Sequence, residues 1–287
     1  MCGIAGVVNF HGEPPPLGLV REMVRAQQHR GPDGEGLVAL DCIALGHRRL
    51  AIIDIDGGHQ PMANEDEQVW VTFNGEIYNF RSLRQQLIRF GHVFRTQCDA
   101  EVIVHAYEQW GDDCVDHFRG MFAFAVVDLR QRRIFLARDH FGIKPLYIRQ
   151  TASALAFSSE LAPLLLLEDS SPELNLRAVE YFLRYRYVPA PETIYQGIQR
   201  LPAAHRCHVE LDGGVIQFDR YWHVPFGVDA PWPENQSEEA IVEEFEDVFR
   251  ESVQTHLVSD VPPGMFLSGG VDSTLVGMNM VRCLDGP

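Results

Sequence analysis

A segment rich in proline, glycine and polar residues divides this 287-residue chain into two parts. The segment, PFGVDAPWPENQ at residues 225–236, has the composition of a linker between domains. The pattern of apolar residues also changes across it. We therefore predict one domain over residues 1–224, a linker over residues 225–236, and the beginning of a second domain over residues 237–287.

The first part contains many short apolar segments separated by turns, which is typical of a sheet-rich domain. The expected strands are residues 4–8, 43–46, 69–73, 122–128, 133–138 and 155–158. Three stretches with apolar residues at helical spacing lie between them, at residues 17–28, 80–90 and 101–110. We predict an α+β domain in which helices pack on sheets.

The second part has the order helix, strand, glycine loop and helix. Ser237 can cap a helix whose first turn carries Glu238 and Glu239, and residues 261–267 and 274–284 are the expected strand and second helix. In the loop SGGVDS at residues 268–273, the Gly-Gly pair lets an anion approach the backbone at the start of a helix. This favours pyrophosphate binding, although an isolated Gly-Gly pair is more often a tight turn without a ligand.

Cys2 carries the most suggestive chemistry in the first part. If Met1 is removed, one residue bears both a thiol and a free α-amine, whose ordinary pKa values are about 8.5 and about 7.7 to 8.0. The amine can then accept the proton that the thiol must lose, and a terminal nucleophile of this kind is a known catalytic arrangement. With six cysteines in the chain, the position alone favours a chance placement.

Charge and composition exclude several other classes of protein. A net charge of −16 without a basic run argues against nucleic-acid binding. The cysteines are widely spaced, without a Cys-x-x-Cys pair, so we predict no metal site and a reduced, cytoplasmic chain. The sequence shows neither a signal peptide nor an apolar run of the roughly 20 residues that span a bilayer, so no membrane association is expected.

Motifs from both parts, in the same order, resemble the glutamine-hydrolysing asparagine synthetase family. They are MCGIAG at the N-terminus, HRGPDG at 29–34, GHRRLAIID at 46–54, FNGEIYN at 73–79, DAE at 99–101, RGMFAFAVVD from 119, ARDHFGIKPLY from 137, FSSEL at 157–161, YVPAPETIY from 187 and LSGGVDS at 267–273. The resemblance implies an N-terminal-nucleophile fold, a four-layer αββα sandwich, for the class II glutamine amidotransferase domain. It implies the beginning of an α/β PP-loop ATP pyrophosphatase domain for the second part.

The resemblance also implies a glutaminase site in the first domain. Cys2 would attack the side-chain amide of glutamine, form a glutamyl thioester and release ammonia, with Asn74 and the Gly75 N–H as oxyanion donors. Asn-Gly is in addition a strong hairpin signal. The glutamine-binding residues implied are Arg49 for the α-carboxylate, Glu76 and Asp99 for the α-ammonium, and Leu50, Ile52, Ile53, Asn74 and Gly75 along the pocket. No cofactor is expected for this reaction, and His29, His47 and His140 are interpreted as structural residues.

In the second part the resemblance implies ATP binding, with Mg²⁺, to activate aspartate as a β-aspartyl adenylate. The ATP-binding residues implied are Leu267, Ser268, Gly269, Gly270, Asp272 and Ser273. Because the sequence stops one helix beyond this loop, we expect the second part to be poorly supported and this polypeptide alone to make no asparagine. The resemblance makes a homodimer reasonable, and it marks Ala204 as a departure, since the family often has glycine there.

Three alternatives stay open. Amidotransferases that act on sugar phosphates or phosphoribosyl pyrophosphate share the terminal cysteine, but they are not expected to continue into LSGGVDS. A relative that amidates another carboxylate would share every motif found here. A non-enzymatic binding module would be favoured if Met1 stayed attached and blocked the amine.

Overall fold

The computed structural model of the chain describes residues 1–167, 172–225 and 236–284. The chain forms two compact units, Met1–His223 and Val224–Pro287, and each is described by itself. Most of the predicted linker, residues 226–235, lies outside the described residues, and the exact domain boundaries therefore stay a prediction.

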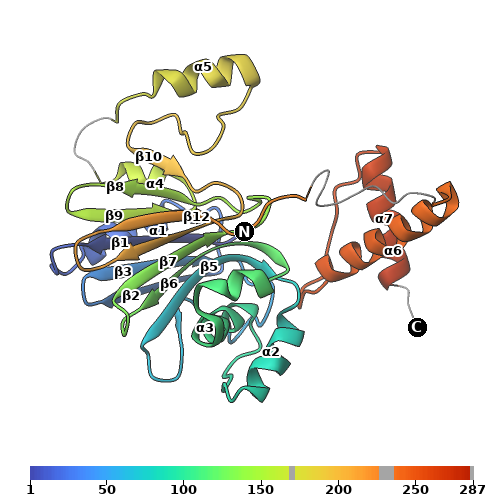
Figure 1. Ribbon diagram of the computed structural model, residues 1–287, viewed down its shortest axis with the longest axis horizontal. Coiled ribbons are helices and arrows are strands. Elements are labelled where there is room, and N and C mark those ends of the chain that lie inside the picture. Colours follow the sequence, from blue (N-terminus) through green and yellow to red (C-terminus); the bar gives the residue numbers. More distant parts are fainter. Residues whose placement is uncertain (168–171, 226–235, 285–287) are drawn as a thin grey trace. The chain divides into compact units, whose positions relative to one another are not determined.

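The first unit contains two six-stranded antiparallel sheets (Figure 1). The strands of one sheet, in spatial order, are β10 (Ile198–Arg200), β8 (Tyr147–Gln150), β9 (Ala154–Ser158), β1 (Gly3–Asn9), β3 (Ile43–Arg49) and β2 (Gly34–Leu40). Those of the other are β12 (Ile216–Arg220), β11 (His205–Glu210), β7 (Arg133–Arg138), β6 (Gly120–Asp128), β5 (Val69–Ile77) and β4 (Met62–Ala63). The main core fills the space between the sheets, with Ile4, Leu45 and Phe157 from the first facing Val127 and Leu136 from the second.

Helices cover the outer faces of both sheets. On the β1 sheet, α1 (Leu17–Arg25) and α4 (Leu161–Leu165) form a second core through the buried residues Val20, Met23 and Leu164. On the β5 sheet, α3 (Asp99–Trp110) packs on β5 and β4, and α2 (Phe80–Arg89) packs on α3 (Figure 1). The remaining helical segments of the unit are the 3₁₀ helix Gly111–His117 and α5 (Leu176–Tyr185). The order helix, sheet, sheet, helix confirms the predicted four-layer αββα sandwich.

The six expected strands and the three expected helices of this unit are all confirmed, with ends shifted by a few residues. The sequence analysis did not name β2, β4, β8, β10, β11, β12, α4, α5 and the 3₁₀ helix. Several of these are short, and β2 (GEGLVAL) combines two glycines with only partly buried positions. Because strand patterns depend on alternating burial over four or more residues, such segments give little signal.

Ala204, at the family's glycine position, has a backbone φ of +57°. An L-residue in this left-handed region costs roughly 1 to 2 kcal/mol relative to glycine. The turn is held by two main-chain hydrogen bonds, from the Ala204 N–H to the Asp139 carbonyl at 2.9 Å and from the Tyr221 N–H to the Ala204 carbonyl at 2.9 Å. The turn therefore keeps the left-handed geometry without its glycine.

The second unit is described mainly as two helices, α6 (Glu238–His256) and α7 (Val271–Leu284). The predicted cap is confirmed, since the Ser237 hydroxyl accepts a hydrogen bond from the Ala240 N–H at 3.2 Å. The predicted strand at residues 261–267 is wrong: the segment is irregular, and the described part of this unit offers no strand to pair with it. Its last two side chains are exposed, Phe266 completely and Leu267 by 66%.

No helix among the described residues is long and apolar enough to cross a membrane.

Candidate active site

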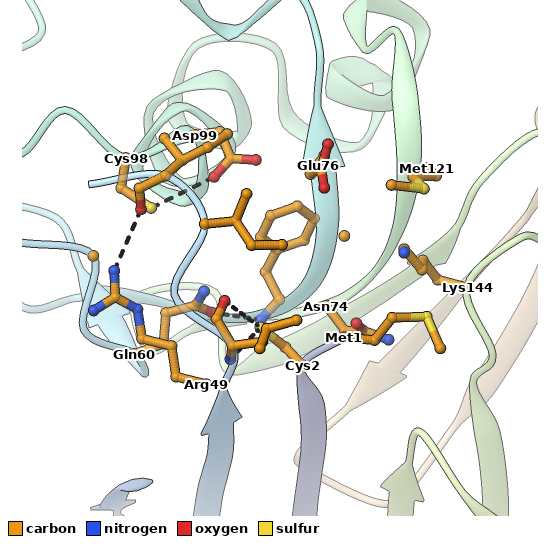
Figure 2. Close-up of a pocket in the computed structure, with 16 residues that line it drawn as sticks. Met1, Cys2, Arg49, Gln60, Asn74, Glu76, Cys98, Asp99, Met121 and Lys144 are labelled. Atoms are coloured by element: carbon orange, nitrogen blue, oxygen red, sulfur yellow. Dashed lines mark hydrogen bonds between the residues drawn. The ribbon is translucent and has the colours of Figure 1, made fainter. Parts of the chain in front are cut away.

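Cys2 lies in a cavity of about 170 Å³ at the end of the sandwich where the two sheets and α3 meet (Figure 2). Cys2 immediately precedes β1, Arg49 ends β3, Asn74 lies within β5 and Asp99 begins α3. The residues that line the cavity are Met1, Cys2, Arg49, Leu50, Ile52, Ile53, Gly58, Gln60, Phe73, Asn74, Gly75, Glu76, Cys98, Asp99, Met121 and Lys144. Residues more than 140 positions apart in the sequence therefore share one small space, which can hold a ligand of few heavy atoms.

The Cys2 thiol is held by the main chain of Leu50. Its Sγ accepts a hydrogen bond from the Leu50 N–H at 3.3 Å and lies 3.7 Å from the Leu50 carbonyl oxygen. On the other side, the Arg30 guanidinium donates to the Cys2 carbonyl at 2.8 Å and to the Glu160 carboxylate at 3.1 Å. Burial raises the pKa of the Cys2 thiol, so this fixed thiol needs a nearby base before it can act as a nucleophile.

Asn74 presents a buried amide with no hydrogen-bond partner in the described part of the chain. The residue is fully buried, and neither its Oδ1 nor its Nδ2 is bonded. An unsatisfied buried polar group costs about 1 to 3 kcal/mol, so a cavity-lining amide of this kind suits a ligand that completes its bonding. The hairpin interpretation is wrong, because Asn74 and Gly75 lie inside β5, opposite Ala123 and Phe122 of β6.

Position 75 requires glycine because of close packing against β6, and not because of a turn. A Cβ atom at this position would lie 2.1 Å from the Met121 carbonyl oxygen and 2.8 Å from the Phe122 Cα. Both of these are main-chain atoms of β6 and cannot move aside. Only glycine permits β5 to approach β6 this closely beside Asn74.

The Arg49 guanidinium is anchored on one side by main-chain carbonyl groups. It donates to the carbonyls of Ile55 at 2.6 Å, Asp54 at 2.5 Å and Ile53 at 3.3 Å. A Cβ at Gly58 would lie only 2.5 Å from its Nη2. The positive charge is therefore held at the cavity wall in one orientation.

Two carboxyl groups face the cavity from the side of β5 and α3 (Figure 2). Burial, together with the charge of Asp99, raises the pKa of Glu76 to about 7, while Lys144 and the N-terminal amine oppose the shift. Burial also raises the pKa of Asp99 to about 6, although its carboxylate accepts a hydrogen bond from the Ile77 N–H at 3.0 Å. Both carboxylates would be stabilised by a ligand that brings a positive charge.

The three histidines of the motifs make structural contacts, as predicted. Burial lowers the pKa of His47 to about 3, so it is neutral, and its Nε2 lies 3.1 Å from the Phe73 carbonyl oxygen. His29 lies 2.9 Å from the Glu160 carboxylate, and His140 packs against Trp222. None of the three is among the residues that line the described cavity.

In the second unit, the loop before α7 is organised by its own side chains. The hydroxyl groups of Ser268 and Ser273 are 3.0 Å apart, and the Gly270 N–H donates to the Ser268 hydroxyl at 3.3 Å. Gly269 has a φ of +80°, which favours glycine. The loop brings together the two serines and the start of α7.

Comparison with models of protein families identifies the family of this chain. The model described as "Glutamine amidotransferase domain" matches residues 1–222. The chain belongs to the glutamine amidotransferase family. A second model, described as "Asparagine synthase", matches residues 244–287, so the amidotransferase domain is followed by the beginning of an asparagine synthase domain.

Individual relatives of this amidotransferase agree with both matches. "Asparagine synthetase [glutamine-hydrolyzing] 1" of Bacillus subtilis is 35% identical over 283 residues, covering 96% of this chain and 43% of its own length. "Putative asparagine synthetase [glutamine-hydrolyzing] 2" of Methanocaldococcus jannaschii is 35% identical over 300 residues, covering 97% of this chain and 56% of its own length. The chain thus spans about half the length of the curated relatives it matches.

A solved structure supports the fold of the amidotransferase. Glutamine phosphoribosylpyrophosphate amidotransferase from B. subtilis, in complex with ADP and GMP, matches with a TM-score of 0.56 and 16% sequence identity. The match covers 99% of this chain and 64% of the other. At this level of identity the likeness concerns the fold alone.

All the residues predicted for the glutaminase site line the same cavity of the amidotransferase domain. The sequence analysis did not assign the seven others to the cavity, Met1, Gly58, Gln60, Phe73, Cys98, Met121 and Lys144. Four of them lie within the motifs of the family resemblance, namely Met1, Phe73, Met121 and Lys144, and Cys98 directly precedes the DAE motif at 99–101.

Lys144 is the most informative residue among those missed. Its side chain lines the cavity although the residue is 94% buried, at 6% exposure. The Asp139 carboxylate accepts hydrogen bonds from the Lys144 N–H at 2.9 Å and the Ile143 N–H at 2.9 Å, and Arg138 donates to the Lys144 carbonyl at 2.6 Å. These contacts fix the main chain of Lys144, whose side chain brings a positive charge into the amidotransferase cavity near enough to act on Glu76 (Figure 2).

Proposed function

We propose that this chain carries the glutaminase of a glutamine-dependent asparagine synthetase. The observation that carries the proposal is that the Cys2 thiol shares a small cavity with the buried, unpartnered amide of Asn74. A nucleophile beside an unused hydrogen-bond donor is the arrangement that acyl transfer requires, because the donor can stabilise the oxyanion of the tetrahedral intermediate.

Glutamine would be bound by the two charged groups on its α-carbon. The Arg49 guanidinium suits the α-carboxylate, because its planar donors match a carboxylate. Glu76 and Asp99, whose carboxylates burial destabilises, suit the α-ammonium. With the amino-acid end held in this way, the side-chain amide of glutamine extends toward Cys2 and Asn74.

The reaction would run through a thioester. After removal of Met1, the α-amine of Cys2 accepts the thiol proton and Sγ attacks the amide carbon of glutamine. The Asn74 amide and the Gly75 N–H bind the oxyanion, and the intermediate collapses with the proton returned to the departing ammonia. Water then hydrolyses the thioester to give glutamate.

The second unit would supply the acceptor reaction. We propose that the loop at residues 268–273 binds the pyrophosphate of ATP, with Leu267 near the adenosine. The Ser268 and Ser273 hydroxyls and the start of α7, where a helix N-terminus favours an anion, support this assignment. Mg²⁺ would accompany the phosphates, and the names of the relatives make aspartate the proposed acceptor of the ammonia.

The glutaminase assignment is tested by the Cys2→Ala variant. Glutamate release from glutamine should fall to the uncatalysed level, while Cys283→Ala, a substitution of a cysteine in the second unit, should leave it unchanged. Intact-mass measurement of the wild-type chain should show the loss of Met1. Hydrolysis that persists in Cys2→Ala, or an active protein that retains Met1, would reject this mechanism.

A further inference from the structure

A group of three potential metal ligands lies on the outer helical layer, away from the residues of the glutaminase cavity. His92 follows α2, while His105 and Glu108 are one turn apart on α3, which packs against α2 (Figure 1). The side chains of His92, His105 and Glu108 are 16%, 1% and 14% exposed. The group is therefore largely buried but open to solvent on one side.

The ligand atoms converge on one carboxylate oxygen. The Oε2 atom of Glu108 lies 3.2 Å from the Nδ1 of His105 and 3.8 Å from the Nδ1 of His92. Zinc binds nitrogen and carboxylate oxygen at about 2.0 to 2.2 Å, which places neighbouring ligands of a tetrahedral site roughly 3.4 Å apart. The two distances to Glu108 bracket this value, and all three ligand atoms lie within 4.8 Å of one another, so the side chains would draw together to admit the ion.

The far side of each ligand is supported by an outer contact. The Nε2 of His92 lies 3.3 Å from the Gln109 Oε1, and the Nε2 of His105 lies 3.8 Å from the Glu101 Oε1. The other oxygen of Glu108 accepts a hydrogen bond from the Asn64 amide at 2.6 Å. Metal-binding histidines usually donate their second N–H to such an oxygen, which turns the first nitrogen toward the metal.

A proton is the competing occupant. Although burial opposes it, the carboxylates of Glu101 and Glu108 raise the pKa of His105 to about 9, so a protonated His105 can pair with Glu108. That proton pairs only one of the two histidines with Glu108. The Nδ1 of His92, with its Nε2–H directed at Gln109, faces the same carboxylate oxygen at 3.8 Å, beyond hydrogen-bond distance.

The charges around the group also favour a cation. Glu65, Glu101 and Glu108 all act on His105, and the half-exposed guanidinium of Arg130 lies 3.6 Å from the other oxygen of Glu108. We propose that His92, His105 and Glu108 bind a divalent transition-metal ion, Zn²⁺ by preference, with a water molecule as the fourth ligand. This site departs from the metal-free prediction, because His92 and His105 lie 13 positions apart, outside the usual short-spaced motifs.

The ion would tie the turn after α2 to α3. Because α3 begins at Asp99, which lines the glutaminase cavity, the site would stiffen a helix that carries one wall of that cavity. The proposed role is structural, and it does not depend on the glutaminase mechanism.

The site is tested by Zn²⁺ binding to the full 287-residue chain. The Cys2→Ala variant is used as background so that the Cys2 thiol cannot bind the ion. We expect about one Zn²⁺ per chain after dialysis, and a rise in Tm on adding Zn²⁺, because metal that binds only the folded state stabilises it. His92→Gln and Glu108→Gln should each weaken binding by at least about 10- to 100-fold, the cost of losing even an outer-shell partner.

The exposed His11 provides a matched control, since His11→Gln should leave Zn²⁺ binding unchanged. Co²⁺ offers a second measurement in the unaltered cluster, because four-coordinate binding should give intense visible absorption that is lost in His92→Gln. Failure to retain Zn²⁺, or retention that is the same in His92→Gln, Glu108→Gln and His11→Gln, would overturn the proposal and assign the cluster to protonated ion pairs.

Discussion

The residues of the two candidate sites, one in each unit of the chain, are positioned by different kinds of contact. In the amidotransferase unit, the cavity side chains come from β3, β5, β6 and α3, and Asn74 and Asp99 are almost completely buried. In the second unit, the loop at residues 268–273 is organised by contacts between neighbours in sequence, and the side chain of Phe266 before it is fully exposed. One site is positioned by a complete fold and the other by local hydrogen bonds.

This difference shows what long-range packing contributes to a site. The Asn74 amide can remain buried without partners because the surrounding sandwich supplies the free energy that its desolvation costs. The loop at residues 268–273 needs no such support, since its hydroxyl groups pair with each other and with the Gly270 carbonyl. Substitutions at the site of the first unit should therefore change the rate of glutamine hydrolysis. Substitutions in the second unit should change only the local stability of its helices.

Asn74→Ala should give the largest effect in this comparison. Removing one preorganised oxyanion donor costs roughly 10²- to 10³-fold in kcat. Steady-state glutaminase kinetics would measure it, with Asn9→Ala, at a partly exposed asparagine at the end of β1, as the control. A kcat within a few fold of the wild-type value would mean that the buried amide does not act on the reaction.

The pH dependence of glutamine binding should report on the two buried carboxyl groups. Glu76 and Asp99, with pKa values of about 7 and about 6, lose their charges as the pH falls through this range. The α-ammonium of glutamine then loses its partners, so KM should rise by about tenfold between pH 8 and pH 6. Glu76→Gln should raise KM and remove the part of the pH dependence near pH 7. The control Glu173→Gln, at an exposed position, should keep the wild-type dependence of KM on pH. A KM independent of pH would contradict the assignment.

Lys144→Met should shift the same profile. Because the positive charge of Lys144 lowers the pKa of Glu76, its removal should move the rise in KM to higher pH, by about one unit for a neighbouring charge. Lys144→Arg keeps the charge and should restore the profile. If the methionine and arginine variants behave alike, Lys144 acts through packing rather than through its charge.

Much of this site could be predicted from the sequence, for reasons that differ between residues. Cys2, Arg49, Asn74 and Asp99 lie in contiguous motifs, so one resemblance assigns all of them. Glycine at position 75 reflects the close approach of β6, which no local pattern reveals.

The predictions that failed depend on partners distant in the sequence. The strand expected at residues 261–267 requires neighbouring strands, and its apolar residues alone do not form one. The Asn-Gly pair suggested a turn because its strand partners, Ala123 and Phe122, lie almost 50 residues further along the chain. The position of Lys144 at the cavity likewise depends on the hydrogen bond that its N–H donates to the Asp139 carboxylate.

Ser237→Ala should give the smallest effect and tests the local character of the second unit. The Ser237 hydroxyl caps α6 through the Ala240 N–H, and loss of such a cap costs about 1 kcal/mol. Hydrogen exchange of the first-turn amides of α6 should accelerate by roughly fivefold, while the amides of β5 and the glutaminase kcat should not change. Asn175→Ala, which removes the matching cap of α5 in the first unit, provides the counterpart. If Ser237→Ala also altered glutamine hydrolysis, the two units would have to be energetically coupled, and the separation drawn between their sites would fail.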